Sequence, residues 1–359
     1  MSTPSQRNFS HRPLWRSPAS CDELLRSIES WDEFLKVVKG LGKTKEANKW
    51  KGDIFERLVQ LFLQHSPEYQ LQLETVWLYA EIPVKLKEQL NLSDNERGID
   101  LLAKTKKGEY WGVQAKYRAD ESGSMPLRKL GTFGTQVAAV SKGLSRGLIC
   151  ATKREKTPDF ANATFDFEHI LLDRWESLPA EFWEAVRQAA AGKKVEPLVP
   201  RNPHQYQMAA IDAATLHFIE KANRRGKLIM PCGTGKSLMG YWTAIVALKA
   251  TTVVVAVPSL DLIRQTFAAW AREAVANRLP LDALIVCSDK STSSEGDTHT
   301  SDLSTPVTTD PGEIRAWLNA PGAEECVRVV FVTYQSGKVL ADAVGRFQFD
   351  VGLFDEAHK

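Results

Sequence analysis

The segment PCGTGKS at residues 231–237 constrains the fold of this chain more than any other feature. It follows an apolar run, KLIMPC, that is typical of a strand, and it precedes residues with helical patterning. A glycine-rich loop in this position can turn backbone N–H groups inward around phosphate oxygens. In such a loop Lys236 would reach the β- and γ-phosphates of a nucleotide, and the Ser237 hydroxyl would ligate Mg²⁺. The strict pattern begins with glycine, where this chain has Met230.

A second segment supplies the carboxylates that such a loop needs. DVGLFDEAH at residues 350–358 is an apolar strand that ends in Asp355 and Glu356. Asp355 can hold the metal of a bound ATP, and Glu356 can polarise the attacking water. The intervening apolar runs alternate with amphipathic helices, as in a parallel sheet that is covered on both faces. We therefore expect an α/β lobe that binds ATP with Mg²⁺, through contacts from Gly233, Thr234, Gly235, Lys236 and Ser237.

Three further segments extend the pattern, and together the five motifs resemble those of superfamily-2 helicases in the order of that family. These segments are HQYQMAAI (204–211), VPSLDLIRQT (257–266) and VTYQS (332–336). The resemblance implies a first RecA-like lobe over 204–359, with Gln207 against the adenine base and residues 257–266 on the DNA backbone. The family also needs a second RecA-like lobe. Because the sequence stops directly after DEAH, we expect it to be the N-terminal part of a longer protein, incompetent for full ATP turnover alone.

A different constellation lies earlier in the chain. GID (98–100) and VQAK (113–116) are expected on two strands that the KKG turn at 106–108 joins. Gln114 and Lys116 are two residues apart and share one face of their strand, to which Asp100 of the paired strand can also project. Two side-chain oxygens, with the backbone carbonyl of the intervening alanine, suit a hard cation such as Mg²⁺. The ammonium group could orient a water molecule and stabilise developing charge, although the same short pattern also arises on ordinary hairpins.

The surroundings of this constellation favour a nuclease. Residues 104–156 hold 12 Lys/Arg against four Asp/Glu, which is a footprint for a phosphate backbone or, alternatively, a solvated basic face. Glu56 lies on a preceding amphipathic helix. Over residues 46–175 these features resemble the Mrr-like branch of the PD-(D/E)xK nucleases. The resemblance implies a metal site of Asp100 and Gln114, with Lys116 and Glu56 completing the catalytic set.

The chain therefore divides into a restriction-endonuclease-like α/β domain at 21–191 and the RecA-like lobe at 204–359. A Pro-rich linker at 192–203 joins them, and residues 1–20 are rich in Ser, Pro and Arg and are expected to be disordered. The combination resembles the front end of type ISP restriction-modification enzymes. That resemblance implies additional C-terminal domains, namely a second motor lobe, an adenine methyltransferase and a target-recognition domain.

Composition limits the remaining choices. No apolar run approaches the roughly 20 residues of a membrane helix, and the polar N-terminus lacks a signal sequence, so we expect a cytoplasmic protein. The leading hypothesis is an ATP-dependent restriction endonuclease whose Mg²⁺-dependent cleavage is coupled to translocation on double-stranded DNA. A nuclease-helicase of DNA repair or phage defence without a methyltransferase is one alternative. A non-cutting DNA-binding module fused to a helicase lobe is another.

Overall fold

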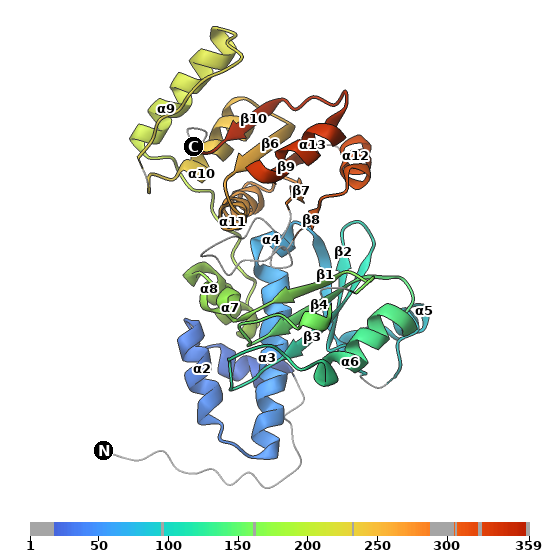
Figure 1. Ribbon diagram of the computed structural model, residues 1–359. Helices are drawn as coiled ribbons and strands as arrows, with labels where there is room; N and C mark the ends of the chain where they lie inside the picture. Colours follow the sequence, from blue (N-terminus) through green and yellow to red (C-terminus); the bar gives the residue numbers. More distant parts are fainter. Residues whose placement is uncertain are drawn as a thin grey trace, which may run out of the picture.

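The computed structural model consists of two α/β domains, each built on a five-stranded sheet (Figure 1). The structure describes residues 18–94, 97–160, 163–231, 233–287, 305, 307–321 and 325–356.

The N-terminal sheet has the strand order β1-β2-β3-β4-β5. Its strands are β1 (Leu73–Leu78), β2 (Leu101–Thr105), β3 (Tyr110–Lys116), β4 (Leu144–Ala151) and β5 (Phe167–Ile170). The first three strands pair antiparallel, and β3, β4 and β5 pair parallel. The expected KKG turn is confirmed, since the N–H of Gly108 donates to the Thr105 carbonyl and closes the connection between β2 and β3.

Helices cover both faces of this sheet. One face packs against α1 (Pro18–Leu25), α2 (Trp31–Gly40), α3 (Lys45–His65), α7 (Leu172–Glu176) and α8 (Ala180–Ala190). The other face packs against α5 (Val84–Gln89), α6 (Leu127–Thr135) and the π-turn η2 (Gln136–Val140). Side chains alternate between the two cores, so that Val113 and Ala115 face α3 while Ile149 and Ala151 face α6.

The C-terminal sheet has the order β10-β6-β9-β7-β8 and is wholly parallel among its described strands. These strands are β6 (Thr252–Val257), β7 (Leu281–Val286), β8 (Val307–Thr308), β9 (Val327–Thr333) and β10 (Val351–Phe354). One face is covered by α10 (Lys236–Tyr241), its π-helical continuation η5 (Trp242–Ala247) and α11 (Leu260–Ala276). The other face is covered by α12 (Pro311–Asn319) and α13 (Gly337–Val344).

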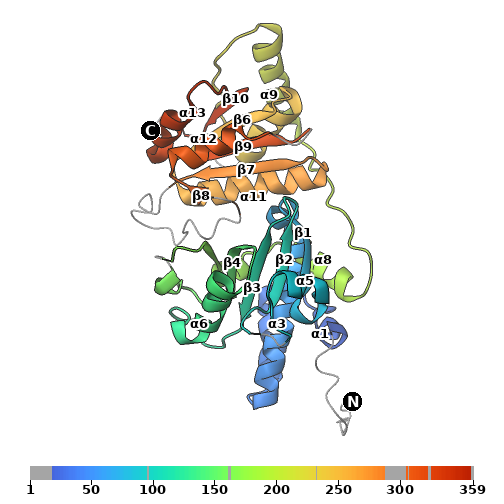
Figure 2. The same ribbon diagram turned by 90° about the vertical axis from the view of Figure 1, so that its right-hand side faces the viewer.

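The two domains meet on α11. Figure 2 shows this helix between the C-terminal sheet and the N-terminal domain, where the short helix α4 (Pro67–Gln70) packs against it. The predicted linker leaves α8 and runs without helix or strand to α9 (Gln205–Thr215), which projects from the C-terminal domain with the π-turn η4 (Leu216–Glu220) (Figure 1).

Three expectations need correction. The run KLIMPC forms no strand over its described residues 227–231, and Leu228 and Ile229 are exposed, because no described strand pairs with it and β10 ends the sheet. Helix α1 begins at Pro18, inside the segment expected to be disordered, whereas residues 1–17 lie outside the described part. The Ser-, Thr- and Asp-rich composition of residues 288–312 predicts a long exposed loop, but β8 and the start of α12 lie within this segment. None of the described helices has the length and apolar character needed to cross a bilayer.

Candidate functional site

Strand register brings the predicted nuclease residues together. Leu101 of β2 pairs with Val113 of β3, so Asp100 and Gln114 lie opposite each other, and the N–H of Asp100 donates to the Val113 carbonyl at 2.8 Å. Lys116 ends β3. Because Val113 and Ala115 face α3, the alternating side chains of Gln114 and Lys116 project from the opposite face.

The Asp100 carboxylate is held in one orientation. Its Oδ2 accepts hydrogen bonds from the Ala115 N–H at 2.7 Å and from Lys116 Nζ at 3.0 Å. The Asp100 side chain is 1% exposed, and its second oxygen, Oδ1, is buried without a hydrogen-bond partner. Burying a carboxylate oxygen without a hydrogen-bond partner costs folding free energy. This oxygen is therefore a candidate to bind a ligand.

The Gln114 amide offers a second such atom. Its Nε2 donates to the backbone carbonyl of Gly98 at 2.7 Å, and since a carbonyl can only accept, this bond fixes which end of the amide is oxygen. Oε1 is buried and has no partner. Gly98 itself has φ +82°, and a Cβ there would lie 2.8 Å from the backbone nitrogen of Phe133 in α6, so only glycine fits the turn that presents this carbonyl.

Asp100 Oδ1 and Gln114 Oε1, two buried oxygens without hydrogen-bond partners beside the Lys116 ammonium group, are suitable ligands for a hard cation. Oxygen ligands from a carboxylate and an amide are what Mg²⁺ prefers, and each would relieve an unsatisfied buried atom. No three His, Cys, Asp or Glu side chains converge in the described part of the chain, so a cation bound here would have few charged ligands. The donor set at Asp100 and Gln114 therefore suits one divalent ion held partly by neutral oxygen.

The predicted fourth member of the site, Glu56, lies on a helix and not on either of the two strands. It belongs to α3, which packs on the opposite face of the sheet from Gln114 and Lys116. The described partners of Asp100, Gln114 and Lys116 do not include it, whereas its charge acts on the Cys21 thiol of α1. Burial, with the nearby acidic side chains, raises the pKa of Cys21 to about 12. The catalytic role of Glu56 stays a prediction.

Sequence reasoning missed the residues that hold the segment after Lys116. The Thr152 hydroxyl accepts from the Arg118 N–H at 2.6 Å and donates to the Arg118 carbonyl at 2.9 Å. The buried Lys153 binds the Asp120 carboxylate at 3.1 Å, and hydrogen bonds from Ser122 and Lys153 lower the pKa of Asp120 to about 2. The signal was available, because Thr152 follows β4 directly and β4 lies parallel to β3.

The predicted phosphate-binding loop has the backbone that its glycines require. Gly233 has φ +76° and Gly235 has φ +80°, and Gly235 is the residue immediately before α10. A Cβ on Gly235 would lie 2.9 Å from the Nε2 atom at the end of the Gln207 side chain, which can shift, so it is the left-handed backbone conformation that favours glycine there. The Thr234 hydroxyl donates to the Pro231 carbonyl at 2.7 Å and closes the loop. Cys232 lies outside the described residues.

Gln207 lies against the loop itself. Its Nε2 donates to the Thr234 carbonyl at 2.9 Å, and its Oε1 accepts from the His204 N–H at 2.8 Å. Tyr206 adds a bond from its hydroxyl to the same Thr234 carbonyl at 3.3 Å. The predicted adenine contact of Gln207 thus stays a prediction, while the structure gives this residue a contact with the loop.

Helix α11 and β10 complete the surroundings of the loop. The indole N–H of Trp270 donates to the Ser237 carbonyl at 2.8 Å, and the hydroxyls of Ser237 and Thr266 lie 3.4 Å apart. Asp355 follows β10, and Tyr334 donates a hydrogen bond to its backbone carbonyl. No described hydrogen bond or ion pair joins Lys236 or Ser237 to Asp355. Trp270 and Tyr334 are the site neighbours that sequence reasoning overlooked, although Tyr334 belongs to the VTYQS motif.

The acidic pair of the DEAH segment follows β10 directly. Glu356 has φ +53°, and its N–H donates to Asp355 Oδ1 at 3.0 Å, so the two acidic residues form a tight turn after β10. The structure places Asp355 at the end of a parallel strand, as the sequence predicted, and the metal and water roles of the pair stay predictions.

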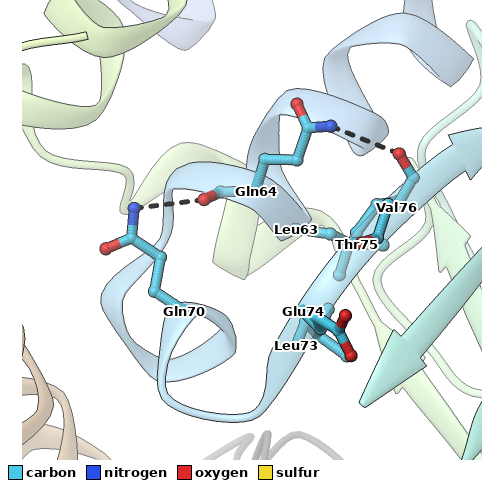
Figure 3. Close-up of a pocket in the computed structure, with 7 residues that line it drawn as sticks. All are labelled: Leu63, Gln64, Gln70, Leu73, Glu74, Thr75 and Val76. Carbon is cyan, nitrogen blue, oxygen red and sulfur yellow. Dashed lines mark hydrogen bonds between the residues drawn. The ribbon is translucent and has the colours of Figure 1, made fainter. Parts of the chain in front are cut away.

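A small pocket lies away from both sites. It is lined by residues from the end of α3, α4 and β1, where Gln64 donates to the Val76 carbonyl and Gln70 donates to the Gln64 carbonyl (Figure 3). None of the predicted site residues lines it. The pocket therefore adds nothing to the assignment of chemistry.

Comparisons with known proteins find two family matches along the chain. Residues 64–189 match the family described as restriction endonuclease, and residues 201–359 match the family described as type III restriction enzyme, res subunit. The first part of the chain is therefore similar to a restriction-endonuclease domain, and the second part is similar to the res subunit of type III restriction enzymes. No curated protein matches the chain.

Among solved structures, the fold is similar to that of the ATP-dependent type ISP restriction-modification enzyme LlaBIII bound to DNA. The TM-score is 0.67 at 22% sequence identity, over 91% of this chain and 20% of that one. This chain therefore spans about one fifth of the length of that enzyme. The predicted α/β architecture, a restriction-endonuclease-like domain followed by a RecA-like lobe, is confirmed, as is the predicted resemblance to this class of enzyme.

Proposed function

We propose that this chain is the nuclease and motor part of an ATP-dependent restriction endonuclease that cuts double-stranded DNA with Mg²⁺ and moves along it with ATP. We propose further that it acts in the cytoplasm, as part of an enzyme with a second motor lobe. The observation that carries the nuclease half is the pair of buried, partnerless oxygens, Asp100 Oδ1 and Gln114 Oε1, beside Lys116.

The chain's own residues have distinct tasks in cleavage. Asp100 and Gln114 would hold the divalent cation, which when bound polarises the scissile phosphate and lowers the pKa of a water molecule. The Ala115 N–H and Lys116 hold Asp100 Oδ2, so that Oδ1 keeps a fixed direction. The Lys116 ammonium group would also stabilise negative charge that develops on the phosphate. Thr152 and Lys153 would keep the following segment in place beside the DNA backbone.

The motor half rests on the loop geometry. The positive φ angles of Gly233 and Gly235 turn the backbone around the space where phosphates would lie, at the start of α10. Lys236 would contact the β- and γ-phosphates and Ser237 the Mg²⁺ of ATP, with Asp355 and Glu356 supplying the metal and water contacts from the end of β10.

Plasmid nicking tests the nuclease proposal. Wild type should nick supercoiled DNA in Mg²⁺ or Mn²⁺ and not in EDTA, whereas Lys116→Ala should reduce nicking at least about a hundredfold. Lys142→Ala is the matched control, because Lys142 is an exposed lysine of the same basic segment, outside this group of contacts. Equal loss of nicking activity in both variants would show that only the positive charge of the basic segment matters and that Lys116 has no specific role. DNA binding without nicking by any variant would favour the non-cutting DNA-binding module.

Nucleotide binding tests the motor proposal separately. A fluorescent ATP analogue should bind wild type in the presence of Mg²⁺ and bind Lys236→Ala at least about tenfold more weakly, because a charge-assisted phosphate contact is lost. Lys338→Ala in α13 removes an exposed lysine from the opposite face of the sheet and should bind normally. Equal binding by all three proteins would exclude the proposed ATP site.

A further inference from the structure

Helix α11 carries two sets of contacts on opposite faces. At about 100° per residue, Thr266 and Trp270 project roughly 180° away from the direction midway between Arg264 and Arg272. The first pair touches Ser237 of the phosphate-binding loop. The second pair touches the nuclease domain, because Arg264 bonds to Asp173 of α7 at 3.0 Å and Arg272 bonds to Glu181 of α8. One helix thus joins the phosphate-binding loop to two helices of the nuclease domain.

The Arg272 contact is the more strongly built of the two. Its guanidinium group donates to both carboxylate oxygens of Glu181, at 2.8 and 3.3 Å, and to the Val199 carbonyl of the linker at 2.9 Å. It also binds Glu273 at 2.8 Å, and Glu273 is fully buried. Arg272 is 10% exposed on its side chain, whereas Arg264 is 34% exposed and therefore more screened by solvent.

The linker is fastened to the same place. Besides the Arg272 bond to Val199, the Arg201 N–H donates to Glu273 Oε2 at 3.1 Å. The Pro-rich segment therefore lies along α11, and Arg272 and Glu273 hold α8, the linker and the motor helix together. A displacement of α11 would therefore act on α8 and on the linker through the bidentate Arg272–Glu181 pair and the bonds of Arg272 and Glu273 to the linker.

We infer that α11 couples the nucleotide state at Ser237 to the nuclease domain, through Trp270 and Thr266 on one face and Arg272 and Arg264 on the other. Binding of ATP at the loop orders Ser237, the contacts of Ser237 order α11, and the ion pairs to Glu181 and Asp173 extend that ordering into α7 and α8. This inference rests on the proposed ATP site. It assigns to α11 a positioning role that is separate from its contribution to the hydrophobic core.

Amide hydrogen exchange with and without a non-hydrolysable ATP analogue and Mg²⁺ tests the inference. In wild type, the analogue should slow exchange about fivefold or more in peptides covering 233–241, 260–276 and 172–190. The variant Glu181→Ala/Asp173→Ala removes both carboxylates from the nuclease side and leaves the loop and α11 unchanged. It should keep the protection at 233–241 and lose it at 172–190.

The control is Glu184→Ala, because Glu184 lies on α8 and its described hydrogen bonds are to Arg187 and Gln188 of the same helix. It should behave like wild type, and Glu181→Gln provides a milder second variant that keeps side-chain size. Protection at 233–241 that never reaches 172–190 in wild type would overturn the coupling while leaving the ATP site standing. Unchanged protection at 172–190 in the Glu181→Ala/Asp173→Ala variant would also overturn the coupling. Absence of protection at 233–241 would instead refute the proposed ATP site.

Discussion

The indole N–H of Trp270 reaches the backbone carbonyl of Ser237 at 2.8 Å, and this bond ties α11 to the first turn of the helix that follows the phosphate-binding loop. Trp270 is fully buried, and Ser237 at the other end of the bond is half-buried. The residue therefore acts on the loop through the backbone of Ser237 and not through contact with a nucleotide.

We predict that Trp270→Phe weakens binding of an ATP analogue about fivefold, because one buried hydrogen bond contributes about 1 kcal/mol. Fluorescence titration measures the dissociation constant. Trp317→Phe in α12 is the control, since the buried Trp317 Nε1 has no hydrogen-bond partner and the substitution removes none. An unchanged dissociation constant for Trp270→Phe would show that the bond is structural only.

A second prediction concerns the cation site. Gln114→Glu places a carboxylate oxygen against the Gly98 carbonyl, where Nε2 now donates, and should lower the free energy of unfolding by about 1–3 kcal/mol in EDTA. Mn²⁺ should restore more stability to this variant than it adds to wild type, because the new negative charge strengthens cation binding. Thermal unfolding with and without Mn²⁺ measures both effects.

Gln64→Glu is the matched control for that experiment. Gln64 also donates its amide to a backbone carbonyl, that of Val76, but it lies at the pocket in Figure 3, away from Asp100. It should lose stability without any recovery in Mn²⁺. If Mn²⁺ restores neither variant, or both equally, Asp100 and Gln114 do not form a cation site.

Much of both sites was predictable because local sequence determines it. Gln114 and Lys116 share a face through the two-residue period of a strand, and Gly235 is recognisable as the residue before a helix. The sequence could not show that one carboxylate oxygen of Asp100 is left without a partner, because that depends on the Ala115 N–H and the Lys116 ammonium group both binding the other oxygen. The position of Glu56 likewise depends on which face of the sheet α3 covers.

The interface between the domains could not be predicted from the sequence for a different reason. Arg272 and Glu273 look in the sequence like solvated charges on an amphipathic helix, yet Glu273 is fully buried under the linker. The apolar run at 227–231 shows the converse error. Its composition favours a strand, but a strand also requires a hydrogen-bonded neighbour, which the described residues do not supply.

A third prediction compares two glycines, Gly235 with a left-handed backbone and Gly52 inside a helix. Gly235→Ala should abolish measurable ATP binding and cost about 1–2 kcal/mol of stability, because φ +80° is unfavourable for alanine. Gly52→Ala in the middle of α3 meets nothing within 4 Å and should stabilise the protein by about 0.5–1 kcal/mol. Chemical denaturation of both variants measures the contrast, and equal effects would argue against the left-handed conformation at Gly235.

The last prediction concerns acid and the contact between domains. Hydrogen bonds from Arg272 lower the pKa of Glu181 below its ordinary value of 4.5. A carboxyl group whose pKa is lower in the docked state contributes stability above pH 4.5 and loses it as the pH falls through that lowered pKa. Docking of the two domains should therefore weaken in acid. Because Glu181 is 46% exposed, the pair contributes on the order of 1 kcal/mol or less, or about a threefold change in the docking equilibrium.

Energy transfer between dyes on the two domains measures this equilibrium, with circular dichroism confirming that both domains stay folded. Glu181→Gln should be less docked at pH 7 and should lose the part of the pH dependence that Glu181 causes. The pKa of Glu184 is also lowered, chiefly by Arg187, but this pair lies within α8. Glu184→Gln should therefore keep the wild-type pH profile. Identical profiles for wild type and Glu181→Gln would show that the Glu181–Arg272 pair does not hold the domains together, because a neutral side chain at 181 cannot respond to pH.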